Sequence, residues 1–260
     1  MHRFIAFANL ILSTTLSAQP AAGTPPAFEV ATIKPADAGP KASRYLIMKG
    51  SDHFVARDYT LKSLIAAAYD LNPKAISGGP SWVESNAYDI LATTPGDTRP
   101  ARDVQMSMLR ALLAERFALT FHREPRVFSI YAIELAASGA KLKPTATPDA
   151  APSVGPATVF RDHVVLPGRN ASVADLATLF QRAILDRPVV DRTGLTGHYD
   201  FDLDWAPDTS QFDGSLSAPD TTPSAPLFTA IQQQLGLRLT PTKGPVSALI
   251  IDQAQPPTPN

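Results

Sequence analysis

Apolar residues recur at helical spacing in four segments of the chain. Two of these segments begin directly after Thr60 and Ser172, whose hydroxyl groups can accept a backbone N–H at the start of a helix. The other two cover residues 108–117 and 227–235, and Gly236 after the last one is typical of a helix end. The pattern therefore predicts four helices.

The segments between these helices show the alternation or the short apolar runs of β-strands. Alternation covers residues 117–121 and 235–239, and after a turn each is followed by an apolar run, at 128–135 and 246–252. We expect separate strands on either side of each turn, a hairpin before the first helix of each half, and an additional strand at 28–34. Short helices with mostly antiparallel strands belong to the α+β class.

The second half of the chain repeats the pattern of the first. Residues 76–97 and 189–208 both run from an apolar strand end through a glycine turn and an aromatic residue to Tyr-Asp and an alternating strand. The flanking segments 51–71 and 161–184 correspond as well, each with Asp-His before a strand, a cap and a helix. We interpret this as an internal duplication into two lobes, each with the order β-β-α-β-β-α-β-β.

A proline- and alanine-rich stretch at 144–156 has the composition of a linker and separates a first lobe, residues 27–143, from a second, residues 157–256. At the N-terminus, residues 1–18 combine Arg3 with an apolar run and small residues before a cleavage point. This is the pattern of a cleavable signal peptide, so we expect an exported protein, periplasmic or extracellular.

Composition and charge limit the classes of partner. The chain of 260 residues has no cysteine, so we expect neither disulfides nor a thiolate nucleophile. Its 23 Lys and Arg nearly balance 24 Asp and Glu, which argues against nucleic acid as a partner. Beyond the signal, no apolar run is long enough for stable membrane insertion. We expect an unknown protein, peptide or cell-envelope ligand.

The sequence around Asp191 resembles the Asp-Thr-Gly of aspartic proteases, but Arg192 separates the aspartate from Thr-Gly. The corresponding place in the first half has no second carboxylate for a catalytic dyad. We therefore expect no catalytic residues here and interpret the glycines of both halves as turn residues, namely Gly78, Gly79, Gly194 and Gly197.

Carboxylates and histidines are the other candidates for chemistry. Asp200, Asp202 and Asp204 lie on one face of an expected strand, where they could hold a cation, although a solvent-facing strand accounts for them as well. His53 and His163 each follow an aspartate at corresponding places and could pair as metal ligands or as acid and base. No zinc-type spacing accompanies them, and we expect no metal and no cofactor.

Aromatic residues gather at the turn-and-strand region of both halves. Most of them should lie in the core, and any that are exposed would form a contact patch for a ligand. The residues expected to bind a partner are Trp82, Tyr88, His198, Tyr199, Asp200, Asp202 and Trp205.

Several segments in fixed order carry a resemblance to a known family: "FEVATIKP", "TLKSLIAAAYDL", "ISGGPSWVESNAYDI", "MLRALLAERFALTFHRE", "KLKP", "RPVVDRTGLTGHYDFDLDW", "LFTAIQQQLGLRL" and "KGPVSALIID". Over nearly the whole mature chain, the sequence resembles the soil-associated exported protein family. Its defining domain has no known function and is expanded in soil bacteria. Some related proteins fuse this domain to a membrane metallopeptidase of the beta-lactam-sensor type, but the metallopeptidase motif is absent from this sequence.

These observations favour a non-catalytic binding or sensing module that acts outside the cytoplasm. One alternative is a secreted hydrolase with a site between the two lobes, built from Asp52, His53, Asp162 and His163 or from the row at Asp200. Another alternative is a purely structural protein of the cell envelope.

Overall fold

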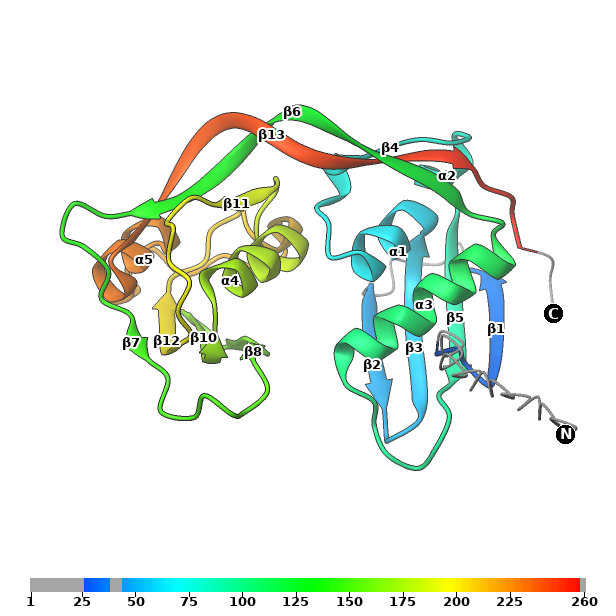
Figure 1. The fold of residues 1–260 in the computed structure, drawn as a ribbon, viewed down its shortest axis with the longest axis horizontal. Coiled ribbons are helices and arrows are strands. Elements are labelled where there is room, and N and C mark those ends of the chain that lie inside the picture. The colour runs from blue at the N-terminus through cyan, green and yellow to red at the C-terminus, as the bar shows by residue number, and fades with distance from the viewer. Residues whose placement is uncertain (1–25, 38–43, 258–260) are drawn as a thin grey trace, which may run out of the picture.

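The computed structural model describes residues 26–37 and 44–257 and shows an α+β fold with mostly antiparallel sheets (Figure 1). The predicted signal peptide, residues 1–18, lies outside the described residues. Two lobes, each with its own hydrophobic core, are joined by a long two-stranded ribbon. No helix in the described ranges has both the length and the apolar composition to cross a membrane.

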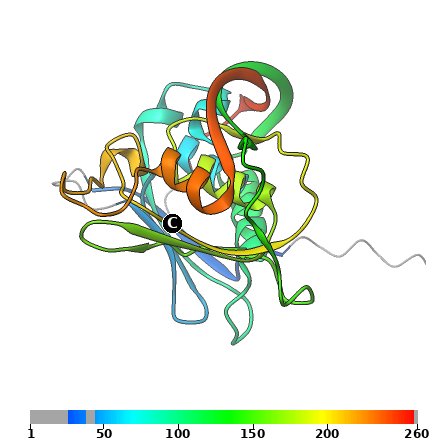
Figure 2. The ribbon, with the colours of Figure 1, turned by 90° about the vertical axis from the view of Figure 1, so that its left-hand side faces the viewer.

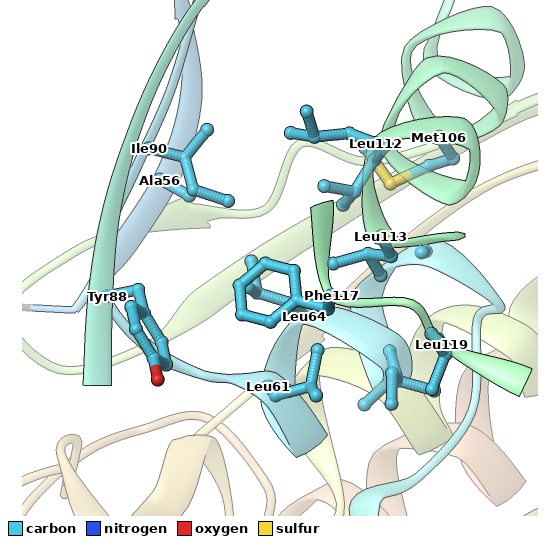
Figure 3. Close-up of a cluster of buried hydrophobic side chains, with 14 of the residues drawn as sticks. Ala56, Leu61, Leu64, Tyr88, Ile90, Met106, Leu112, Leu113, Phe117 and Leu119 are labelled. Carbon is cyan, nitrogen blue, oxygen red and sulfur yellow. The ribbon is translucent and has the colours of Figure 1, made fainter. Parts of the chain in front are cut away.

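The first lobe is a 4-stranded antiparallel sheet covered on one face by helices. In sheet order its strands are β1 (Val30–Pro35), β5 (Ala87–Thr93), β3 (His53–Thr60) and β2 (Tyr45–Lys49). Its helices are α1 (Leu61–Ala68), the short α2 (Trp82–Ser85) and α3 (Arg102–Arg116), with the 3₁₀ turn η1 (Pro73–Ala75) after α1. Figure 3 shows its core, where Phe117 packs edge-on against Tyr88 at 5.3 Å between ring centres.

The second lobe has the same plan. Its sheet runs in the order β7 (Lys143–Pro144), β12 (Tyr199–Trp205), β10 (Val164–Ala171) and β8 (Ser153–Val154), and β9 (Thr158–Val159) also pairs with β10. Its helices are α4 (Val173–Leu179), which continues into the π-helical turn η2 (Phe180–Ile184), the 3₁₀ turn η3 (Phe212–Gly214) and α5 (Leu227–Leu235).

The ribbon consists of β6 (Thr120–Leu135) and β13 (Leu237–Gln253), which pair antiparallel from one lobe to the other (Figures 1 and 2). The predicted turns between 121 and 128 and between 239 and 246 were wrong, because each segment is one continuous strand. Within the described chain, the middle of each strand has a free outer edge. A proline whose nitrogen faces this edge is tolerated, because no neighbouring strand needs the N–H that proline lacks. Prolines in this segment therefore do not end the strand.

The ribbon exchanges strand ends between the lobes. Strand β6 leaves α3 of the first lobe and places Tyr131 and Ile133 in the second core. Strand β13 leaves α5 of the second lobe and places Leu249 and Ile251 in the first core. Each exchanged end also gains a parallel partner, β11 (Val189–Asp191) on β6 and β4 (Ile76–Gly78) on β13. Each lobe therefore contains residues from both halves of the chain.

Helix caps confirm three of the expected helix boundaries, the starts of α1 and α4 and the end of α5, whereas α3 begins at Arg102 and not at 108. The Thr60 hydroxyl accepts the Ser63 amide at 3.2 Å, and the Ser172 hydroxyl accepts the Asp175 amide at 3.1 Å. Asp175 completes a capping box by accepting the Ser172 amide at 2.9 Å. Gly236 ends α5 in the left-handed conformation at φ 66°, as a C-terminal cap requires.

The two lobes share an unusual local feature at corresponding places. Strands β3 and β10 each carry a bulge at which Asp58 and Asn170 take positive φ, 57° and 48°. In both lobes a carboxylate of the neighbouring strand accepts the amide of that residue, Asp89 at 3.0 Å and Asp200 at 2.9 Å. The two lobes are therefore alike in their elements and in these contacts. That they arose by internal duplication stays a prediction.

Replacement of Gly78 by alanine should destabilise the protein more than replacement of Gly194. Both residues have positive φ, 82° and 70°, which costs an L-residue roughly 1–2 kcal/mol. A Cβ at Gly78 would in addition lie 2.7 Å from the carbonyl oxygen of Ile251, whereas a Cβ at Gly194 meets nothing within 4 Å. Chemical denaturation of the two variants checks this order, and equal losses would contradict it.

Candidate functional site

The aromatic residues expected to form a contact patch lie in two separate cores. Tyr88 is 4 % exposed in the first core, where Trp82 packs edge-on against it at 6.5 Å. Trp205 is fully buried in the second core, and its indole Nε1 donates to Gln211 Oε1 at 2.7 Å. Neither Tyr88 nor Trp205 presents its ring to solvent, so they contribute to packing.

The polar members of the expected patch lie on β12 and in the turn before it. His198 is exposed, and its carbonyl accepts the Thr145 amide at 3.0 Å. Tyr199 is half-buried against the second core. Asp202 pairs with Arg169 at 2.8 Å. The structure brings these residues of the second lobe together, but not with those of the first lobe.

Asp200 has a structural role in the second lobe. Its two carboxylate oxygens accept the backbone amides of Asn170 at 2.9 Å and Ala146 at 3.0 Å. These two hydrogen bonds hold the pKa of Asp200 below its ordinary value, because they favour the ionised form. The carboxylate fixes the bulge of β10 to the segment that follows β7.

The glycine turns have more than one cause. Gly78, Gly79 and Gly194 adopt positive φ of 82°, 74° and 70°. Gly197 does not; a Cβ there would lie 2.7 Å from the Tyr199 hydroxyl, so a larger residue would require the Tyr199 side chain to shift. The Asp191 carboxylate accepts both the amide and the hydroxyl of Thr193 at 2.8 Å, which shapes the turn.

Each Asp-His pair is a contact between neighbouring residues, and His163 Nε2 also lies 3.8 Å from Asp204 Oδ2. His53 Nδ1 lies 2.6 Å from Asp52 Oδ1, at the start of β3. His163 Nδ1 lies 2.8 Å from Asp162 Oδ1, before β10 in the other lobe, and its ring stacks on Phe160. Within residues 26–37 and 44–257, no three His, Cys, Asp or Glu residues gather in a way that could hold a metal ion.

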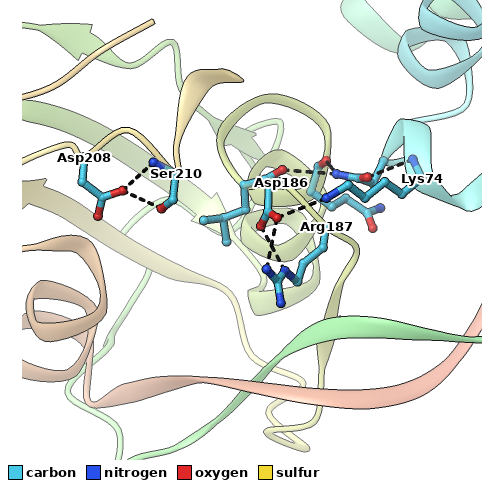
Figure 4. A network of polar contacts seen from close by, with 8 residues as sticks. Lys74, Asp186, Arg187, Asp208 and Ser210 are labelled. Carbon is cyan, nitrogen blue, oxygen red and sulfur yellow. Dashed lines mark hydrogen bonds and ion pairs between the residues drawn. The ribbon is translucent and has the colours of Figure 1, made fainter. Parts of the chain in front are cut away.

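The lobes meet through polar contacts that the sequence did not predict. The buried amide of Asn72 donates to the carbonyls of Gln181 at 2.9 Å and Leu185 at 3.2 Å. Beside it, Lys74 Nζ lies 3.1 Å from Asp186 Oδ2 (Figure 4). Burial disfavours the charged form of Asp186, but hydrogen bonds from Arg187 and Lys74 outweigh this effect and lower its pKa. These hydrogen bonds and the ion pair therefore hold the segment after α1 against the segment around η2.

Two arginines share one carboxylate beside this contact. Arg102 Nη1 donates to Asp70 Oδ2 at 3.4 Å. Arg102 Nη2 and Arg182 Nε lie 2.9 Å and 3.4 Å from Asp70 Oδ1, in both cases without the geometry of a hydrogen bond. Asp70 follows α1 in the left-handed conformation at φ 53°. Arg182 lies in η2, so the π-helical turn directs its side chain toward the first lobe. Two positive charges thus face one negative charge.

The Arg182 guanidinium is short of partners. Only 23 % of its side chain is exposed, and the long contact to Asp70 is its ion pair within the described ranges. A guanidinium carries five N–H donors, so burial with one ion pair leaves most of them open. Burial and the nearby Arg102 charge lower the pKa of Arg182 to about 10, so that it stays charged at neutral pH.

A cavity of about 280 Å³ opens at this cluster, between the lobes. Asp70 and Arg102 form its wall on the first lobe, and α4, Arg182 and the segment around β8 form its wall on the second. Thr178 and Ser153 add hydroxyl groups, and Leu179 and Val154 add apolar surface. The cavity therefore combines two guanidinium groups and two hydroxyl groups with the carboxylates of Asp70 and Asp175. Guanidinium and hydroxyl donors of this kind can bind an anionic group.

The sequence carries a faint signal for this site. Asp70 follows the start of α1 by the same number of residues as Arg182 follows the start of α4. Lys74 and Asp186 correspond in the same way. Residues at corresponding positions, with opposite charges, therefore face each other across the boundary between the lobes. An alignment of the two halves could have marked these pairs, but the π-helical turn that positions Arg182 leaves no pattern in the sequence.

Residues 62–254 match a family described as protein of unknown function, DUF3738. The chain belongs to this family. Comparison with curated proteins and with solved structures gives no match. Membership in DUF3738 confirms the expected domain of unknown function. Soil origin, export and the fusion of some related proteins to a metallopeptidase stay predictions.

Replacement of Asn72 by alanine should lower the free energy of unfolding by about 1–3 kcal/mol, because two carbonyls at the contact between the lobes lose their donor. Lys74→Ala is the matched control at the same contact. Its ion pair is largely exposed, 61 % for the lysine, and should contribute about 0–1 kcal/mol. Urea denaturation compares the two, and a smaller loss for Asn72→Ala would contradict the role of the buried amide.

Asp200→Asn should destabilise the protein at neutral pH, because one of the two amides would then face an NH₂ group instead of an oxygen. The pKa of Asp200 is lowered in the folded state, so its contribution is present above the ordinary value of 3.8 and is lost as pH falls below it. The difference in melting temperature between wild type and variant should shrink on acidification. Asp202→Asn, which breaks one exposed ion pair, serves as the control.

Proposed function

We propose that the protein is a non-catalytic binding module that takes a small anionic ligand, carrying a carboxylate or phosphate group, in the cavity between its lobes. The observation that carries the proposal is the Arg182 guanidinium, mostly buried and with one long ion pair in the described ranges, opposite the second guanidinium of Arg102. An anion between them would supply the acceptors that Asp70 alone does not provide.

The geometry of the cavity supports this choice over an uncharged ligand. A planar guanidinium offers paired N–H donors that match the two oxygens of a carboxylate or phosphate. Asp175 also lines the cavity, where its Oδ2 accepts the amide and the hydroxyl of Ser172. Of the two arginines, Arg182 has the longer contact to Asp70, 3.4 Å against 2.9 Å for Arg102.

The contact between the lobes offers a way to report binding. The ligand would touch Arg102 on one lobe and Arg182 on the other, so its binding energy would add to the contact made by Asn72 and Lys74. A ligand that binds only the joined lobes stabilises that arrangement by mass action. As part of the proposal, we place this module outside the cytoplasm, in agreement with the predicted signal peptide and the exported family that the sequence resembles.

Isothermal titration with inorganic phosphate and with succinate tests the proposal. We expect saturable binding of at least one of these anions, and a loss of roughly tenfold or more in affinity for Arg182→Met, because a charge-assisted pair is removed. Methionine keeps the apolar stem of the side chain. Arg238→Met, which removes an exposed pair with Glu134, is the matched control and should bind as the wild type does. Equal affinity of Arg182→Met and wild type, or no binding at millimolar anion, would refute the proposal.

A further inference from the structure

The outer edge of β12 is paired over a much shorter length than the corresponding edge in the first lobe. There, β1 pairs with β5 from Val30 opposite Thr93 to Pro35 opposite Tyr88. In the second lobe, β7 pairs with β12 only where Lys143 and Pro144 lie opposite Asp200 and Tyr199. No strand of the described chain pairs with Phe201–Trp205 on this edge, and the next residue, Ala206, forms a bridge with Pro226.

The two edges agree where both are paired. Lys34-Pro35 of β1 lies opposite the Tyr-Asp of β5, and Lys143-Pro144 of β7 lies opposite the Tyr-Asp of β12. Before Lys34, the chain runs on along β5. Before Lys143 it turns away, and the Lys141 amide donates to the Leu235 carbonyl at 2.8 Å. The second lobe therefore lacks the strand segment that the first lobe has.

The Gln234 side chain makes two of the hydrogen bonds that a neighbouring strand would make with β12. Gln234 Oε1 accepts the Asp204 amide at 2.9 Å, and its Nε2 donates to the Asp204 carbonyl at 2.6 Å. A glutamine amide has the same donor and acceptor as one peptide group, so it can substitute for one residue of a strand. At the corresponding place in the first lobe, the Thr93 carbonyl accepts the backbone amide of Glu29 at 2.9 Å.

A cavity of about 310 Å³ lies where the chain turns away from β12. Lys141 and Lys143 line it together with Asp202 and Gln234. Lys141 Nζ donates to the Gln233 carbonyl at 2.8 Å, but neither lysine has a carboxylate partner in the described ranges. Alternate residues of a strand point to the same edge, so the peptide groups of Asp202 and Asp204 both face this side.

We infer that the open edge of β12 binds an extended peptide as an added antiparallel strand, opposite Asp202–Trp205, with the C-terminal carboxylate of the peptide between Lys141 and Lys143. The direction follows from β1, which runs antiparallel to β5 and reaches Lys34 last. Lys143 is already paired with Asp200 of β12, so an incoming chain must end before it reaches Lys143. Gln234 moves aside as the peptide forms the ladder. This inference goes beyond the anion site between the lobes and does not depend on it.

The test uses a synthetic peptide with the sequence of residues 29–32, EVAT, whose counterpart in the first lobe bonds to β5 through the Glu29 amide and the pairing of Val30–Thr32. Fluorescence anisotropy of the N-terminally labelled peptide measures its affinity for the purified protein. We expect saturable binding, and protection of the Asp202 and Asp204 amides from hydrogen exchange on addition of the peptide.

Three matched changes make the result specific. Amidation of the peptide C-terminus should weaken binding by roughly tenfold, because it removes the charge that the lysines face. Replacement of the peptide valine and alanine by proline should abolish binding, since proline cannot donate to the ladder. Gln234→Ala in the protein should bind the free-acid peptide more tightly, because no side chain has to be displaced. No binding, or binding unaffected by these changes, would overturn the inference.

Two further measurements distinguish the peptide edge from the anion cavity and from self-association of the protein. Arg182→Met should bind the peptide as the wild type does, so failure at one site does not decide the other. Sedimentation of the protein alone tests whether the edge is filled by β1 of a second copy. Self-association that is lost in Val30→Pro would identify that occupant and would contradict a partner peptide.

Discussion

The antiparallel pairing of β6 with β13 is the constraint on which the rest of the structure depends. These two strands link the lobes, and their far ends complete each other's cores through Tyr131 and Ile133 on one side and Leu249 and Ile251 on the other. Neither lobe can bury its apolar face with the residues of its own half alone. The placement of the lobes, and with it the cavity between Arg102 and Arg182, follows from this exchange.

The boundary between the lobes is polar, which distinguishes it from the two cores. Lys74 faces Asp186, and Asp70 faces Arg182, in pairs that occupy corresponding positions of the two halves. If the halves arose by duplication, as the sequence predicts, an unchanged copy would have placed like charges opposite each other. Opposite charges at these positions favour the closed arrangement, while an exposed pair such as that of Lys74 with Asp186 contributes little to overall stability. The boundary is thus suited to adjustment by a bound anion.

Local signals in the sequence predicted local structure well. Thr60, Ser172 and Gly236 marked helix ends because their side chains, or the lack of one, act on neighbouring backbone groups. Pro125 lies in the turn that was expected between 121 and 128, and it was misleading, because proline is accommodated where a strand of the ribbon has a free edge. The candidate site depends on contacts between residues about a hundred positions apart, such as Asn72 with Leu185, and on a π-helical turn. Neither leaves a periodic pattern, so the site was found only in the structure.

The exchange of strand ends has a consequence for dissecting this protein. A cut in the segment 144–156 divides the sequence at its most linker-like point, yet each fragment would keep a strand whose apolar end belongs in the other's core. Either fragment alone would expose that end as an unpaired β-edge, a surface that promotes aggregation. Produced together, the two fragments should assemble without a covalent link, because the ribbon joins them through hydrogen bonds along its full length.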